Sequence, residues 1–212
     1  LWPLSHEGLE LEQAENAPRY KTLLQRTTYQ EDAPDTPEVV SIRFNEGFPT
    51  HVNGAKLNPV ELLQTLNDLG GKHGVGITDM VENRVVGLKA RGVYENPGGA
   101  ILYKAHQLLE QLCLDRQTMS FKQTVGIKYS ELVYSGEWYT PLKEALDAFV
   151  HSTQSTVTGE VKLMLYKGNM ISHGMTSPYS LYDQELSSFT TGELYRHSDA
   201  EGFITLFGLP LK

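Results

Sequence analysis

Cysteine is almost absent from this sequence, because Cys113 is the only one among 212 residues. A single cysteine excludes an intrachain disulfide and any metal site built from several thiolates. Scarce cysteine is typical of proteins in a reducing compartment, so we expect a cytoplasmic location. The seven histidines are scattered, and His73 has no second ligand at metal-binding spacing, so we expect no metal site.

Long apolar runs and an excess of basic residues are also lacking. No apolar run approaches the ~20 residues that a helix needs to span a bilayer, so the sequence predicts no membrane partner. Lys and Arg number 18 against 26 Asp and Glu, which gives a net charge of −8. Because nonspecific nucleic-acid binding depends on neutralising phosphates, this balance argues against a nucleic-acid partner.

What is present is an ordinary globular composition, with 40% hydrophobic and 21% charged residues. At 212 residues the chain slightly exceeds the usual ~100 to 200 residues per domain, so we expect one domain or two closely packed subdomains. The first residue is Leu1 and not methionine, from which we expect the sequence to be a fragment of a longer chain.

A glycine-rich stretch, residues 70–99, is the most distinctive feature of the sequence. Gly70, Gly71, Gly74 and Gly76 permit backbone angles and close approaches that a Cβ forbids, which predicts a loop. The functional alternative is a phosphate-binding loop. The stretch lacks the Ser or Thr that ends a Walker A motif, and it precedes a strand instead of a helix. We therefore expect a loop shaped for contact or for chain reversal.

After this loop, apolar residues alternate with charged ones, which predicts two half-buried strands between 77 and 93. We expect the turn between them at residues 82–84. The run Pro97-Gly98-Gly99 then ends the second strand and opens a helix. Elsewhere a period of two predicts strands at 38–44, 50–53, 157–165 and 170–175.

Helices are predicted where the apolar period approaches 3.6, namely at residues 58–70, 101–113, 115–138, 141–152 and 177–186. The first begins with Asn58 as N-cap and Pro59 at its first position, and we expect Val60 and Leu66 on its buried face. We expect 101–113 and 115–138 to be core helices. Hairpins and consecutive helices without a βαβ alternation favour an α+β fold with a largely antiparallel sheet.

The N-terminal residues 1–35 are polar and carry three prolines, which is typical of an extended arm that must lie over another part of the protein. Ser5, His6 and Glu7 are its chemically active residues. Spacing alone favours an ordinary surface arm over a binding site.

Five segments carry a resemblance: GKHGVG, VENR, RGVYENPGG, ILYKAH and KYSELVYSGEW. Together they resemble the C-terminal synthetase and multimerisation domain of argininosuccinate synthetase, over residues 1–212. The resemblance implies a ligase that joins L-citrulline to L-aspartate with ATP and Mg²⁺, releasing AMP and pyrophosphate. It further implies that ATP is bound mainly by an N-terminal domain upstream of Leu1, and that the enzyme is a homotetramer.

The resemblance also implies citrulline-binding residues. They are Ser5, Glu82 of VENR and Tyr94 of RGVYENP, and a carboxylate beside hydroxyl groups suits the charged end of an amino acid. The alternative is that Glu82 forms a surface ion pair with Arg84 or Arg91. One departure is that Ile77 and Thr78 replace an arginine and a β-branched residue common in the family.

The resemblance also implies a further C-terminal helix used in oligomer contacts, and we expect that helix to be missing or to lie outside a sequence that ends at Lys212. A second function class stays open. The many apolar helices, and the absence of a nucleophile with an adjacent base, also fit a noncatalytic oligomerisation module.

Overall fold

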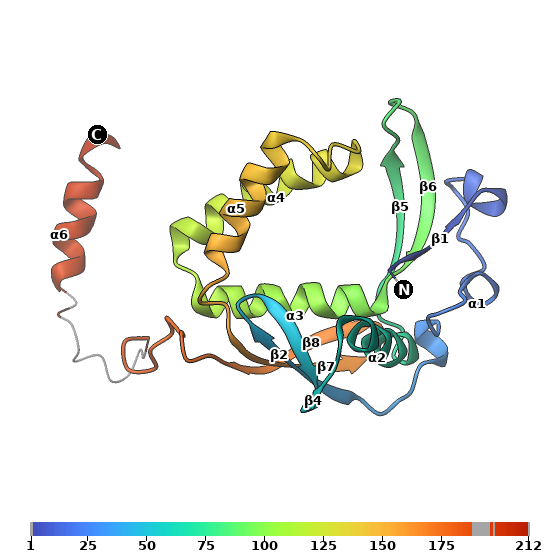
Figure 1. The fold of residues 1–212 in the computed structure, drawn as a ribbon, viewed down its shortest axis with the longest axis horizontal. Coiled ribbons are helices and arrows are strands. Elements are labelled where there is room, and N and C mark those ends of the chain that lie inside the picture. The colour runs from blue at the N-terminus through green and yellow to red at the C-terminus, as the bar shows by residue number, and fades with distance from the viewer. Residues whose placement is uncertain (1, 188–195, 197, 212) are drawn as a thin grey trace.

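A computed structural model describes residues 2–187, 196 and 198–211 of the chain. It contains two antiparallel sheets and six α-helices among these residues, which confirms the predicted α+β class (Figure 1). No helix within the described ranges is long and apolar enough to cross a membrane.

The larger sheet has five strands in the order β4-β3-β2-β7-β8. Their bounds are β2 Glu38–Asn45, β3 Phe48–Val52, β4 Ala55–Lys56, β7 Gly159–Tyr166 and β8 Asn169–Thr176. Alternation along β2 turns Val40, Ile42 and Phe44 to one face, where helices α2 (Pro59–Lys72) and α3 (Pro97–Cys113) cover them (Figure 1). The strands predicted at 38–44, 50–53, 157–165 and 170–175 are confirmed, and they pair as the hairpins β2–β3 and β7–β8.

Helices α2 (Pro59–Lys72) and α3 (Pro97–Cys113) pack together and supply the other half of the core. Leu66 of α2 and Ile101 of α3 are fully buried, and burial of such a side chain is worth roughly 1.5 to 3 kcal/mol. The predicted capping box of α2 is present, with Asn58 and Glu61 bonding reciprocally. The prediction for Val60 was wrong, because its side chain is 53% exposed beside the cap.

The end of α2 also differs from the prediction. Gly70 and Gly71 lie inside the helix, which continues to Lys72. Neither glycine has a positive φ, but other atoms lie very close to both. A Cβ on Gly71 would lie 2.5 Å from the carbonyl oxygen of Arg26. The glycine therefore serves a close approach of the N-terminal arm to α2, and the loop begins only at His73.

The smaller sheet has three strands in the order β1-β6-β5, with bounds β1 Leu4–Glu7, β5 Ile77–Asn83 and β6 Lys89–Glu95. The turn was expected at residues 82–84, but it begins at Arg84, whose amide donates to the carbonyl of Leu88. Val85 and Val86 therefore lie in the turn and are exposed. This hairpin stands upright at the N-terminal end of α3 (Figure 1).

Helices α4 (Arg116–Tyr134) and α5 (Pro141–Thr153) form an antiparallel pair that begins at the C-terminal end of α3 and runs back above it toward the three-stranded sheet (Figure 1). Asp115 caps α4 by accepting hydrogen bonds from two backbone amides. The prediction that α4 is a core helix was wrong, because only Val125 and Leu132 are buried in it. Phe121 and Ile127 are 58% and 65% exposed.

Short elements complete the described chain: η1 Leu9–Glu12, α1 Tyr20–Leu23, η2 Gln30–Asp32, α6 Ser198–Phe207 and η3 Leu209–Leu211. No helix was predicted after residue 186, and α6 is a helix in that part of the chain. The prediction of a helix at 177–186 was wrong. The hydroxyls of Ser177 and Ser180 accept hydrogen bonds from backbone amides two residues later, and these bonds stabilise turns instead of a helix.

Candidate functional site

The three-stranded sheet places the predicted residues Ser5, Glu82 and Tyr94 on one face. Ser5 of β1 and Thr78 of β5 are both register partners of Tyr94 on β6, and Glu82 lies four residues beyond Thr78 on β5. Because side chains alternate between faces with a period of two, all of these side chains point to the same side of the sheet. Residues separated by nearly 90 positions in sequence thus meet in one place.

Tyr94 and Glu82 are joined directly. The Tyr94 hydroxyl donates a hydrogen bond of 2.6 Å to Oε1 of Glu82. This bond, followed by burial and by the charges of Glu82 and Glu7, raises the pKa of Tyr94 to about 12. Tyr94 is therefore neutral at physiological pH and keeps its proton for donation to the carboxylate.

Neither arginine of the surface ion-pair alternative reaches Glu82. Arg91 bonds Asp79 through two nitrogens at 2.9 and 2.8 Å, and Arg84 lies 3.9 Å from Glu7. Among the described residues, Glu82 has no cationic partner. Within the described ranges, its carboxylate accepts a hydrogen bond only from the Tyr94 hydroxyl, which leaves acceptor capacity for a positively charged ligand group.

The opposite face of the same sheet holds the N-terminal arm. Arg91 donates to the carbonyl oxygens of Gln13 and Asn16 as well as to Asp79. Hydrogen bonding from Arg91 is the main cause that lowers the pKa of Asp79, and the Tyr20 hydroxyl donates a third bond to the same carboxylate. These bonds hold the arm against β5 and β6. The sequence predicted such an arm lying over another part of the protein.

Glu95 ties the arm to the end of β6. It is fully buried, and its carboxylate accepts from the amides of Gln25, Arg26 and Thr27 at 2.6 to 2.9 Å. Nε2 of His6 lies 2.7 Å from Oε1 of Glu95. Burial alone would raise the pKa of Glu95, but these hydrogen bonds hold it below its usual value. Because His6 adjoins Ser5, the position of Ser5 depends on Glu95.

Glu95 is a residue that sequence reasoning missed. Its carboxylate follows an apolar strand and precedes Asn96 and Pro97, a position at which the sequence shows no partner. The hydrogen-bond partners of Glu95 lie about 70 to 90 positions earlier in the sequence, so no local sequence pattern predicts them. A charged residue at the end of a buried strand was the one available signal.

In the glycine-rich segment, Lys72 and His73 both contact the carboxylate of Glu38. Lys72 Nζ lies 2.6 Å and His73 Nε2 3.0 Å from the same Glu38 oxygen. These two bonds, with the one from Lys72 first, lower the pKa of Glu38. Lys72 is therefore engaged with a carboxylate and does not face an anion site, as the comparison with the Walker A motif predicts.

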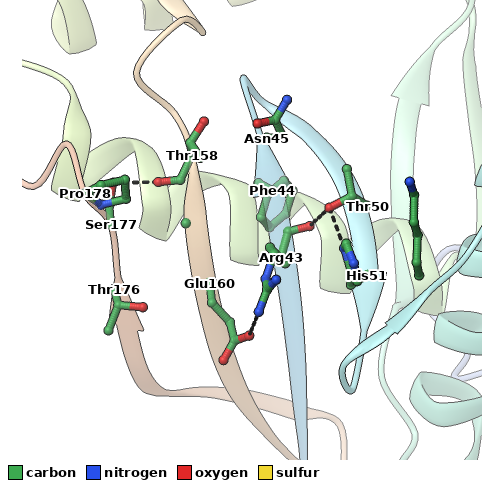
Figure 2. A pocket seen from close by; sticks show the side chains of 12 residues that line it. Arg43, Phe44, Asn45, Thr50, His51, Thr158, Glu160, Thr176, Ser177 and Pro178 are labelled. Atoms are coloured by element: carbon green, nitrogen blue, oxygen red, sulfur yellow. Dashed lines mark hydrogen bonds and ion pairs between the residues drawn. The ribbon is translucent and has the colours of Figure 1, made fainter.

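A separate cavity of about 680 Å³ lies at one end of the five-stranded sheet, as Figure 2 shows. Arg43 and Glu160, register partners on β2 and β7, line it and form an ion pair at 3.7 Å, and the Thr50 hydroxyl donates to the carbonyl of Arg43. None of the three predicted substrate residues lines this cavity. The candidate site is thus the face of the three-stranded sheet that carries Ser5, Glu82 and Tyr94, and it is separate from this cavity.

Comparisons with known proteins cover the whole chain. A family model described as the arginosuccinate synthase C-terminal domain matches residues 1–212. Among curated proteins, the chain is 62% identical over 212 residues to an argininosuccinate synthase of Brachyspira hyodysenteriae, covering 100% of this chain and 52% of that relative. It is 60% identical to one of Agathobacter rectalis, with the same coverage. The chain spans about half the length of the curated relatives it matches.

Proposed function

The chain belongs to the arginosuccinate synthase C-terminal domain family, and on this premise we propose that it is the citrulline-binding and oligomerising half of an argininosuccinate synthase. The complete enzyme would be an ATP-dependent carbon-nitrogen ligase of arginine biosynthesis, located in the cytoplasm. Its reaction joins L-citrulline to L-aspartate. The ureido oxygen of citrulline attacks the α-phosphorus of ATP and releases pyrophosphate, and the aspartate amine then displaces AMP.

The observation that carries this proposal is the Glu82 carboxylate, which bonds Tyr94 and has no cationic partner among the described residues. Citrulline is neutral at its ureido end and carries an ammonium and a carboxylate at the other. An unpaired carboxylate attracts the ammonium, and hydrogen bonds to a charged group are worth ~1.5 to 3 kcal/mol. We propose that Glu82 accepts from the ammonium, with the Tyr94 and Ser5 hydroxyls completing the contact.

The direct test is the melting temperature of the chain with and without citrulline, because a ligand stabilises the folded state that it binds. We expect millimolar citrulline to raise the melting temperature. The matched ligand is 5-ureidopentanoic acid, which lacks only the ammonium and should raise it less. Equal shifts with both ligands would contradict the ammonium contact, and no shift with citrulline would contradict a site on this chain.

ATP with Mg²⁺ we assign mainly to the other half of the enzyme. The lysine of the glycine-rich segment pairs with Glu38, and a net charge of −8 repels a polyphosphate. Calorimetric titration of the chain with Mg-ATP should show no appreciable binding. A micromolar dissociation constant would instead place a phosphate site on this chain.

We also propose that identical subunits assemble through this chain, as a tetramer by family resemblance. Helix α6 exposes Phe203 at 66% and Phe207 at 72%, and α4 exposes Ile127 at 65%. Apolar area of this kind is typical of surfaces that become covered in an oligomer. Assembly and citrulline binding use different elements, so the oligomerising role does not exclude a catalytic one.

A further inference from the structure

Gly92 occupies the middle of β6, where a glycine is unfavourable because it loses more conformational entropy than other residues. Its φ is not among the positive values of the chain, so an alanine could adopt the same backbone. The reason for glycine must therefore be space. A Cβ on Gly92 would lie 3.0 Å from Cε2 of Tyr94, 3.1 Å from its hydroxyl oxygen and 3.2 Å from Cζ.

The register of the sheet explains why the Tyr94 ring lies over Gly92. Glu82 is the register partner of Ala90, which is four residues from Tyr94 on the same strand. At ~3.3 Å per residue, the two side chains start roughly 13 Å apart along the strand direction. The ring can reach Glu82 only by lying back along β6, and residue 92 is the position that it crosses.

We propose that Gly92 is a positioning residue for citrulline binding, because its missing side chain lets the Tyr94 ring lie along β6 and present its hydroxyl to Glu82. This inference rests on the proposed function of Glu82 and Tyr94. An alanine at position 92 pushes the ring outward by a few tenths of an ångström or into another rotamer. The 2.6 Å bond to Glu82 then lengthens or breaks, and the carboxylate loses the donor that orients it.

The first test is Gly92→Ala in a complete synthase that carries this chain as its C-terminal half. We expect the KM for citrulline to rise about tenfold, as for a lost hydrogen bond to a charged group, with the KM for ATP unchanged. The matched control is Gly126→Ala in α4, where a Cβ meets nothing within 4 Å. That variant should keep the KM for citrulline.

A double-mutant cycle with Tyr94→Phe separates positioning from a general structural effect. Phenylalanine keeps the ring and removes only the hydroxyl, so Gly92→Ala should add little to the KM when Tyr94 is already replaced. Equal fold-changes in both backgrounds would overturn the proposal. If Gly92→Ala fails to fold, adding Tyr94→Ala should restore folding because no ring remains to collide, and failure of that rescue would also overturn it.

A spectroscopic measurement on the chain itself does not depend on citrulline. The ionisation of Tyr94, followed by NMR of ¹³Cζ-labelled tyrosine, should move from a pKa of about 12 toward its ordinary value of 10 in Gly92→Ala. An unchanged pKa would refute the positioning role. If the pKa moves while citrulline does not stabilise the unmodified chain, the positioning stands and the proposed function of the site falls.

Discussion

At the residue scale, the site depends on two carboxylates with opposite surroundings. Glu82 is half-buried and keeps a free acceptor side, whereas all the acceptor capacity of Glu95 faces donors inside the protein. The first arrangement suits a ligand and the second suits a structural anchor. Sequence reasoning selected Glu82 through the family resemblance. It missed Glu95, because the stabilising effect of a buried carboxylate depends on hydrogen-bond donors that only folding brings close to it.

Glu95→Gln should destabilise the chain by about 3 kcal/mol, because an amide oxygen accepts fewer bonds and its NH₂ group opposes buried donors. The pH dependence gives a second check. The folded-state pKa of Glu95 lies below its ordinary value of 4.5, so its stabilisation is complete above that pH and is lost as the pH falls further. Urea unfolding from pH 7 to pH 3 should therefore show a flatter acid dependence in the variant.

The control for this prediction is Glu15→Gln, an exposed carboxylate on the same arm. It should leave both the unfolding midpoint and its acid dependence within experimental error of the unmodified chain. If Glu95→Gln behaved like Glu15→Gln, the arm would be held by Arg91 and Asp79 and not by Glu95.

At the element scale, local patterns predicted the hairpins and most helices, and they failed where tertiary contacts decide. The apolar period of α4 predicted a core helix, but its Phe121 and Ile127 are more than half exposed, and Phe121 packs only on Phe149 of α5 among the described rings. The sequence of segment 177–186 is compatible with a helix, but the segment forms turns. Serine hydroxyls accept bonds from its amides, and the amide of Leu181 donates to the carbonyl of Leu112. Neither outcome is visible in a window of the sequence alone.

Gly71 at the end of α2 lies where the N-terminal arm approaches the helix, so its substitution tests this contact. Gly71→Ala gains up to ~1 kcal/mol of helix propensity, but its Cβ would sit 2.5 Å from the Arg26 carbonyl oxygen. Overpacking against backbone costs ~1 to 3 kcal/mol, so the net effect should be destabilising. Gly126→Ala has open space and should stabilise the chain instead. Urea unfolding of both variants measures this contrast, and stabilisation by Gly71→Ala would show that the arm does not approach α2 as described.

At the scale of the whole molecule, α6 stands out because, among the described elements, it packs on η3 and on neither sheet. Figure 1 shows it apart from both sheets, and its apolar residues Phe203, Ile204 and Phe207 are 66% to 72% exposed. Helices of this kind gain their stability from packing and not from propensity. A partner subunit is therefore the surface against which we expect α6 to pack.

The double substitution Phe203→Asp and Phe207→Asp tests this expectation. It should reduce the oligomer to smaller species, measured by light scattering coupled to size-exclusion chromatography, because two charges cannot be buried without partners. The matched control is Asp199→Asn with Glu201→Gln on the first turn of the same helix, which should leave the mass unchanged. An unchanged mass in the aspartate variant would remove α6 from the interface.

If the face carrying Ser5, Glu82 and Tyr94 binds citrulline, the Michaelis constants of Glu82→Gln in a complete synthase will show it. Loss of a charge-assisted hydrogen bond is on the order of 2 kcal/mol, so the KM for citrulline should rise about thirtyfold while the KM for ATP stays nearly constant. Glu15→Gln should change neither constant. A citrulline KM that is the same in Glu82→Gln and in the unmodified enzyme would contradict the account and return Glu82 to the scaffold.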